Sequence, residues 1–353
     1  MSNKTRIAIL LLIIALSASL TACSDRNQII NNHSADVETI DTSNTQSEEK
    51  QIMSENRLEA ENSFPKELAE IPDTYFYEAE QTGTLSDLYY DTYESMAYAQ
   101  KSKVLTKHAV VYLPYGYSEE KQYDVFYLMH GGWSNETTYL GTPDQPNVFK
   151  HVLDHAIADG EIQPMIIVCP TYNNESASDS GDYSLALVLT ENYHNELVND
   201  LIPAVEGKYS TFAETTTKEG LRASRDHRAF CGFSMGSVAT WRTFEYCLDY
   251  FRYFMPSSGS LTTDGAYMAS IVKNSDYQWD DFFIFAASGT DDFAYSAFKQ
   301  QIDAMANVQD GIFRYANNET DGNLYFLEQD GGTHSGEFAL QYFYNGLRWI
   351  WKQ

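Results

Sequence analysis

A serine held between two glycines is the first feature of this 353-residue sequence that could do chemistry. Ser234 lies at the centre of Gly232-x-Ser234-x-Gly236, the pattern of the nucleophile elbow, a strained turn that joins a buried strand to a helix. A side chain at either glycine would collide where strand and helix pass close together, and glycine tolerates the bend best. An apolar run, 229–231, precedes the turn, and a segment that can continue as a helix, 238–244, follows it. We therefore predict that Ser234 is a nucleophile.

A serine hydroxyl reacts poorly at neutral pH, so it needs a base within hydrogen-bond reach and a third group that orients the base. After a nucleophile elbow, these partners follow in the order acid, then histidine. His334, in a glycine-rich loop, is the only histidine C-terminal to Ser234, and we predict that it is the base. For the acid, a strand-like run ending at Ala287 leads to Asp291 and Asp292. One of the two should accept the imidazole N–H and the other should cap a turn or a helix, and the residues alone leave this choice open.

The oxyanion that forms on an attacked carbonyl needs N–H donors that are already in place. Elbow geometry supplies the N–H of Met235, and the His130-Gly131-Gly132 loop after a buried strand should supply a second donor, from Gly132. Two bulky aromatic residues in loops, Trp133 and Tyr172, are expected at the mouth of the pocket as contacts for the substrate.

The elements that must position these residues follow from the apolar runs. Strands are expected at 84–93, 108–113, 124–129, 165–169, 229–231, 253–256, 282–287 and 325–328, and helices at 147–159, 190–206, 238–244, 294–305 and 337–351. The run at 124–129 is continuously apolar, as in a parallel strand that is buried on both faces. Strands that alternate with helices predict an α/β-hydrolase fold, with a mostly parallel central sheet and helices on both of its faces.

The N-terminal segment predicts a lipoprotein. Lys4 and Arg6 precede an apolar run, 7–16, that is typical of a signal-peptide core. The Leu-Thr-Ala-Cys sequence that ends at Cys23 resembles a bacterial lipobox, in which cleavage before the cysteine leaves a lipid-carrying N-terminus. We expect a signal peptide at 1–22, the lipidated cysteine with a disordered polar linker at 23–70, and an esterase domain at 71–353. Acyl chains would tether the protein outside the cytoplasmic membrane.

Composition excludes some classes of partner and site. The formal net charge of −27 repels nucleic acid and anionic membrane surfaces, so neutral or apolar substrates are expected. The four cysteines, at positions 23, 169, 231 and 247, form no CxxC pair, and we expect no disulfide framework. His151 and His155 are four residues apart but have neither the HExxH pattern nor a third ligand, so no metal site is expected.

Five segments together resemble a known family. They are 128–132 (Leu-Met-His-Gly-Gly), 164–168 (Pro-Met-Ile-Ile-Val), 226–236 (from Asp-His-Arg-Ala to Ser-Met-Gly), 289–292 (Gly-Thr-Asp-Asp) and 332–334 (Gly-Thr-His). The sequence over roughly 80–353 is similar to the esterase D-like α/β hydrolases, and most of all to the bacterial feruloyl esterases of carbohydrate esterase family 1, which are often attached to xylanases.

The resemblance implies hydrolysis of ester-linked hydroxycinnamate, mainly ferulate, from the arabinose side chains of xylan, with no cofactor. It also implies that Asp292 is the acid, since the family's Gly-Thr-Asn-Asp pattern has the catalytic aspartate at its fourth position. The partner would be a feruloylated or acetylated plant cell-wall polysaccharide or oligosaccharide. Two other enzymes fit the same residues, an acetyl xylan esterase and an acyltransferase. A carbohydrate-binding lipoprotein without activity is the alternative from another class, and binding without turnover would identify it.

Overall fold

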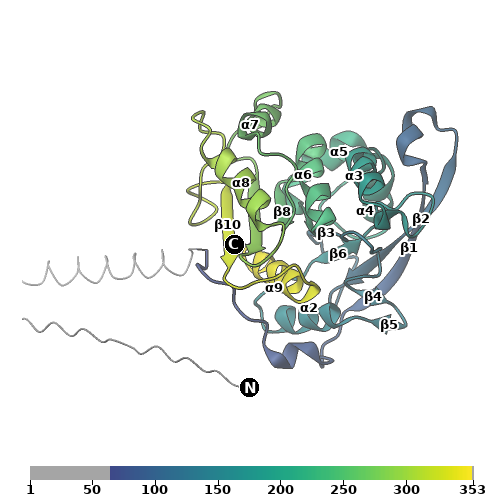
Figure 1. Cartoon of the computed structure of the whole chain (residues 1–353). Helices are drawn as coiled ribbons and strands as arrows, with labels where there is room; N and C mark the ends of the chain where they lie inside the picture. The colour runs from purple at the N-terminus through teal and green to yellow at the C-terminus, as the bar shows by residue number, and fades with distance from the viewer. Residues whose placement is uncertain (1–63, 352–353) are drawn as a thin grey trace, which may run out of the picture. The chain divides into compact units, whose positions relative to one another are not determined.

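The computed structural model describes residues 64–351. Its core is an eight-stranded sheet with the strand order β1-β2-β6-β3-β7-β8-β9-β10 (Figure 1). The strands are β1 (Thr84–Tyr93), β2 (Val104–Leu113), β3 (Val125–Met129), β6 (Ile166–Cys169), β7 (Arg228–Phe233), β8 (Tyr253–Ser257), β9 (Phe283–Gly289) and β10 (Leu324–Gln329), and a small separate hairpin is made by β4 (Gly141–Thr142) and β5 (Gln145–Pro146).

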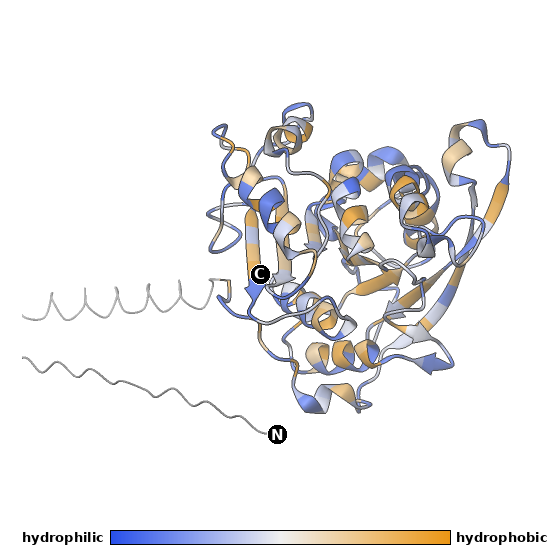
Figure 2. Ribbon diagram, viewed as in Figure 1, coloured by the Kyte–Doolittle hydropathy of each residue, from blue (hydrophilic) through white to orange (hydrophobic). Residues whose placement is uncertain are grey.

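The sheet is mostly parallel, as predicted. β1 pairs antiparallel with β2, and β2 pairs antiparallel with β6. From β6 to β10 in the strand order, each strand runs parallel to the next. Every residue of β3, β6 and β7 is buried. This explains why β3, β6 and the part of β7 after Arg228 do not alternate between apolar and polar residues. Figure 2 shows hydrophobic residues along the central strands and on the helices that pack against them.

Helices cover both faces of the sheet. They are α2 (Val148–Ala158), α3 (Tyr183–Glu196), α4 (Ile202–Glu206), α5 (Lys218–Ala223), α6 (Met235–Cys247), α7 (Gly265–Lys273), α8 (Tyr295–Ala306) and α9 (Gly336–Leu347). One apolar core joins the sheet to α3, α4, α6, α7 and α8, and a second core joins its other face to α2 and α9. The α/β-hydrolase fold class predicted from the sequence is therefore confirmed.

Two features of the helices differ from the sequence prediction. The helix expected to begin at residue 190 begins at Tyr183, because the Asp182 side chain accepts a hydrogen bond from Leu185 N–H and so caps the first turn. A π-helical turn, Leu197–Leu201, then joins α3 to α4. The sequence analysis did not predict α5 or α7, which are short helices of six and nine residues.

The packed region already includes Phe64, ahead of the boundary expected at residue 71. The ring of Phe64 lies 5.2 Å from that of Phe283, 4.7 Å from that of Tyr325 and 5.5 Å from that of Trp349. The N–H of Ala69 donates to Asn345 Oδ1 at 2.8 Å. The expected signal peptide, Cys23 and nearly all of the expected linker lie outside the described residues. Among the helices of residues 64–351, none has the length and hydropathy needed to cross a membrane.

Candidate active site

Ser234 occupies a strained turn between β7 and α6. Its φ of 61° and ψ of −119° lie in a region that residues other than glycine rarely adopt. A Cβ atom at Gly232 would lie 2.4 Å from the backbone of Gly236, and a Cβ atom at Gly236 would lie 2.4 Å from Met129 O. Both glycines of the elbow are thus required by close backbone approach. The turn holds the serine at the carboxyl end of β7, the edge of a parallel sheet where ligands bind.

The structure brings three of the predicted site residues into one hydrogen-bonded line. Ser234 Oγ lies 2.9 Å from His334 Nε2. His334 Nδ1 lies 2.8 Å from both carboxylate oxygens of Asp292. Asp292 follows β9, and His334 lies in the loop between β10 and α9, so each member comes from the carboxyl end of a parallel strand. This arrangement can activate the serine hydroxyl and can stabilise an imidazolium ion.

Burial and the hydrogen bonds to His334 favour Asp292 over Asp291. Asp292 is buried and also accepts the N–H of Ala294 at 2.7 Å, so its carboxylate is fixed. Asp291 is exposed, and its N–H donates to Gly332 O at 3.0 Å. The two loops come together at glycines, because a Cβ atom at Gly289 would lie 2.1 Å from Gly332 O. This close approach brings the acid loop and the histidine loop within reach of one another.

Two N–H groups face the pocket as candidate oxyanion donors. Met235 is the first residue of α6, where a backbone N–H has no acceptor within the helix and where the positive end of the helix dipole lies. In the loop after β3, the N–H of Trp133 donates to Ser180 O at 3.0 Å and is therefore not available. Gly132 lines the pocket, and its N–H has no acceptor among residues 64–351. Gly132 and Met235, the two predicted donors, both line the pocket.

The pocket in front of Ser234 has a volume of about 400 Å³. Its rim carries three exposed aromatic side chains, those of Trp133, Tyr183 and Phe293, which are 78%, 63% and 82% exposed. The full lining is Gly132, Trp133, Ser180, Tyr183, Ser234, Met235, Val238, Ser258, Gly259, Ser260, Phe293, Ala294, Ala297 and His334. The pocket can therefore hold a flat, largely apolar group next to the nucleophile.

Trp133 is at the rim, as expected, but the prediction for Tyr172 is wrong. Tyr172 is 1% exposed. Its hydroxyl donates to Gly131 O at 2.9 Å, and its ring stacks on that of His130 at 4.5 Å. The side chain turns into the core beneath the Gly131-Gly132 loop because an acceptor is available there, which its position after a strand could not reveal.

Sequence reasoning missed two rim residues, Tyr183 and Phe293. Phe293 directly follows Asp292, and its ring lies 4.2 Å from that of His334. Phe233 approaches the same imidazole from the elbow, with its ring at 4.5 Å. Tyr183 follows the Asp182 helix cap. The signal that the sequence offered for Phe293 was a large aromatic residue directly after a predicted triad residue.

The remaining candidates for chemistry have structural surroundings. Within residues 64–351, no cluster of three or more His, Cys, Asp or Glu side chains could hold a metal ion. His155 stacks on Tyr75 with ring centroids 5.0 Å apart. Cys169, Cys231 and Cys247 are buried free thiols, and burial raises the pKa of each thiol above its ordinary value. None of the three is an activated nucleophile.

The family model described as "Putative esterase" matches residues 106–292. One curated relative is "Endo-1,4-beta-xylanase Y" of Acetivibrio thermocellus, which is 39% identical over 254 residues, or 70% of this chain. A second is "Endo-1,4-beta-xylanase/feruloyl esterase" of Xylanibacter ruminicola, which is 28% identical over 193 residues, or 53% of this chain. The chain spans only 22% and 24% of the length of these two relatives.

Solved structures extend the likeness over the whole domain. A serine-to-alanine mutant of the feruloyl esterase module from Clostridium thermocellum, complexed with sinapinate, is 36% identical with a TM-score of 0.70, and the match covers 82% of this chain and 94% of that one. The ferulic acid esterase of Anaeromyces mucronatus, described as a carbohydrate esterase family 1 enzyme, has the same fold at 19% identity with a TM-score of 0.57, over 81% of this chain and 97% of that one. The chain therefore belongs to the esterase family of α/β hydrolases.

Proposed function

We propose that this protein hydrolyses esters of hydroxycinnamic acids, mainly ferulate, that are attached to the arabinose side chains of xylan. The observation that carries the proposal is the hydrogen-bonded line from Ser234 through His334 to Asp292 at the base of a pocket with an aromatic rim. The likeness to a feruloyl esterase module over 94% of that module's length supports the same acyl group.

Acylation follows from the geometry. Ser234 Oγ attacks the ester carbonyl carbon while His334 Nε2, 2.9 Å away, takes the hydroxyl proton. The carbonyl oxygen becomes an oxyanion, and the N–H groups of Gly132 and Met235 donate hydrogen bonds to it. Asp292 accepts the Nδ1–H of the imidazolium and balances its charge. When the tetrahedral intermediate collapses, the bond to the sugar oxygen breaks and His334 returns the proton to the leaving alcohol.

Deacylation uses the same groups in a second cycle. A water molecule gives a proton to His334 and attacks the acyl carbon of the Ser234 ester. The same two N–H groups stabilise the second oxyanion. Collapse breaks the bond to Ser234 Oγ, which recovers its proton from His334 and releases the hydroxycinnamic acid. No cofactor takes part in this proposal.

The rim supplies a reason for an aromatic acyl group. Trp133, Tyr183 and Phe293 present large exposed rings around the pocket, and offset or edge-to-face packing against a phenolic ring is worth about 0.5–1.5 kcal/mol per pair beyond burial. An acetyl group offers no ring to such contacts. The neutral ester also avoids the repulsion that the net charge of −27 would exert on an anionic substrate.

The test is release of ferulic acid from methyl ferulate and from feruloylated arabinoxylan oligosaccharides, by the wild type and by Ser234→Ala. The expected result is turnover of both substrates by the wild type and a fall in kcat of about 10⁴–10⁶ in the variant. Hydrolysis of acetyl esters alone, with no release of ferulate, would contradict the proposed acyl group. Binding of the oligosaccharides without any turnover would contradict an enzymatic role.

We further propose that the protein is a lipoprotein attached to the outer side of the bacterial membrane through Cys23. The support is the charged start, the apolar run and the Leu-Thr-Ala-Cys sequence at the N-terminus. Metabolic labelling with a radioactive fatty acid, followed by membrane fractionation, tests this. The wild type should carry label and pellet with membranes, whereas Cys23→Ser should carry none. Equal fractionation of the two proteins would contradict the anchor.

A further inference from the structure

The peptide between Gly131 and Gly132 is held by two hydrogen bonds on its carbonyl side. Gly131 O accepts from His130 Nδ1 at 2.7 Å and from the Tyr172 hydroxyl at 2.9 Å. The C=O and N–H of a trans peptide lie in one plane and point in opposite directions. Fixing the carbonyl of Gly131 therefore fixes the direction of the Gly132 N–H. Such fixing is needed because two successive glycines restrict the backbone least.

A directed chain of hydrogen bonds determines which nitrogen of His130 carries the proton. The Thr171 hydroxyl accepts the N–H of Asn173 at 3.0 Å and lies 2.7 Å from His130 Nε2. Gly131 O can only accept, so the proton of the neutral imidazole is on Nδ1, and Nε2 accepts the hydrogen of the Thr171 hydroxyl. Burial lowers the pKa of His130 to about 4. The ring is thus neutral at pH 7 and holds one defined tautomer.

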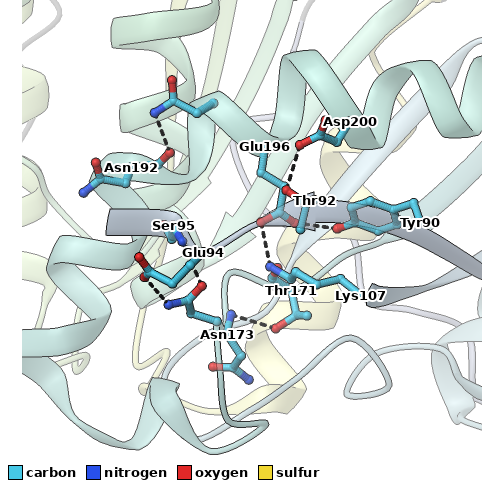
Figure 3. A network of polar contacts seen from close by, with 12 residues as sticks. Tyr90, Thr92, Glu94, Ser95, Lys107, Thr171, Asn173, Asn192, Glu196 and Asp200 are labelled. Atoms are coloured by element: carbon cyan, nitrogen blue, oxygen red, sulfur yellow. Dashed lines mark hydrogen bonds and ion pairs between the residues drawn. The ribbon is translucent and has the colours of Figure 1, made fainter. Parts of the chain in front are cut away.

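The segment that carries Thr171 is itself held by a buried ion pair, seen in Figure 3. Lys107 Nζ donates to Thr171 O at 2.7 Å and to Glu196 Oε2 at 2.8 Å. The Tyr90 hydroxyl donates to the other oxygen of Glu196 at 2.5 Å. The side chains of Lys107 and Glu196 are 6% and 4% exposed. A buried pair with these further hydrogen bonds fixes geometry even where its net stabilisation is small.

We propose that Thr171, His130 and Tyr172 are positioning residues that hold the Gly131–Gly132 peptide with its N–H aimed at the oxyanion. They act through the backbone and do not touch the substrate. The inference rests on the proposed esterase function. Loss of a complete oxyanion donor typically costs 10²–10³ in rate. Removing one of the two hydrogen bonds that aim this donor should cost less, about tenfold in kcat.

The experiment compares Tyr172→Phe with Tyr112→Phe. Tyr112 is an apt control because it is also fully buried, and its hydroxyl also donates one hydrogen bond of 2.9 Å, to Asp154 Oδ1. On methyl ferulate, Tyr172→Phe should lower kcat about tenfold and leave KM within about twofold. Tyr112→Phe should leave both constants within about twofold while lowering the melting temperature at least as much.

A second pair of variants tests the tautomer. Thr171→Val keeps the shape of the side chain but removes the hydroxyl, and Thr171→Ser keeps the hydroxyl. The valine variant should lose about tenfold in kcat, and the serine variant should recover most of it. A merely structural role would not predict this rescue, because serine leaves the larger packing defect.

A third readout reports on the oxyanion directly. An arylboronic acid forms a tetrahedral adduct on Ser234 whose oxygen occupies the place of the oxyanion, whereas free ferulate does not. In Tyr172→Phe and Thr171→Val, the inhibition constant of the boronic acid should rise by the same factor by which kcat falls, with ferulate affinity unchanged. Unchanged kcat and boronate affinity in both variants, beside an active wild type, would overturn the positioning role. A wild type that hydrolyses no ester would instead overturn the proposed function, and this inference with it.

Discussion

Two histidines, His334 in the pocket lining and the buried His130, make the same two kinds of hydrogen bond. The Nδ1 of His334 faces an oxygen of Asp292 and its Nε2 faces the hydroxyl of Ser234. The Nδ1 of His130 faces the carbonyl oxygen of Gly131 and its Nε2 faces the hydroxyl of Thr171. Each imidazole ring therefore lies between an oxygen acceptor and a hydroxyl. The acceptor is a charged carboxylate for His334 and an uncharged carbonyl for His130.

The charge on the acceptor separates a catalytic histidine from a positioning one. The carboxylate of Asp292 can balance an imidazolium ion, so His334 can take a proton from a hydroxyl. A carbonyl cannot do so, and burial lowers the pKa of His130 to about 4. Thr171 consequently gains no nucleophilic character from its histidine. The comparison teaches that a hydroxyl beside an imidazole is weakly activated unless a carboxylate stabilises the imidazolium.

The largest expected effect comes from giving His334 a neutral partner like that of His130. Asp292→Asn should lower kcat on methyl ferulate by about 10⁴, because the imidazolium loses its counter-charge and the tautomer is no longer enforced. The matched control is Asp291→Asn, one residue away, whose side chain is exposed. It should retain kcat within about twofold. Equal losses in the two variants would show that the acid has been misassigned.

The second prediction concerns His130 and the dependence of the free energy of unfolding on pH. The pKa of His130 in the folded protein is about 4, below the value of about 6.5 for an unfolded histidine. Between these values the unfolded chain binds a proton that the folded chain does not, so His130 lowers the free energy of unfolding as pH falls from about 6.5 to about 4. The full loss is at most about 3 kcal/mol.

The measurement is urea unfolding of the wild type and His130→Gln at pH 7 and at pH 4.5. The wild type is expected to lose more stability than the variant on acidification, so that the difference between them becomes smaller at low pH. Other titrating groups are shared by both proteins and cancel in this comparison. An equal loss of stability in the wild type and in His130→Gln would mean that folding does not lower the pKa of His130. The proposed difference between His130 and His334 would then be unsupported.

The smallest expected effect concerns the rim. Trp133 is 78% exposed and is not in contact with either histidine in the ring pairs of the site. Trp133→Ala should therefore raise KM for methyl ferulate about tenfold, equivalent to about 1.4 kcal/mol, with kcat nearly unchanged and no effect on an acetyl ester. Phe293→Ala should change both constants, since the Phe293 ring packs on that of His334 at 4.2 Å. A fall in kcat in the tryptophan variant would mean that the rim also aligns the ester.

The sequence predicted well what depends on local pattern. Apolar runs located the central strands, and the range 84–93 coincides with β1. The elbow, the only C-terminal histidine and the aspartate pair were visible because chain order and glycine spacing constrain them. The residues alone did not separate Asp291 from Asp292, because their difference lies in side-chain direction and burial.

What the sequence could not predict depends on contacts between distant segments. Tyr172 and Trp133 look alike as loop aromatics, yet one side chain turns inward to a carbonyl and the other remains exposed. The role of Thr171 depends on Lys107 and Glu196, which are far from it in the sequence and meet it only when β2, the loop after β6 and α3 pack together. No motif joins these three residues.

The packing of Phe64 places the first described residue relative to the pocket. Phe283 and Tyr325, the partners of Phe64, lie at the amino ends of β9 and β10, whereas Asp292 and His334 follow the carboxyl ends of the same strands. The first described residue thus packs at the edge of the sheet opposite to the pocket. Contacts made at that edge therefore do not cover the pocket.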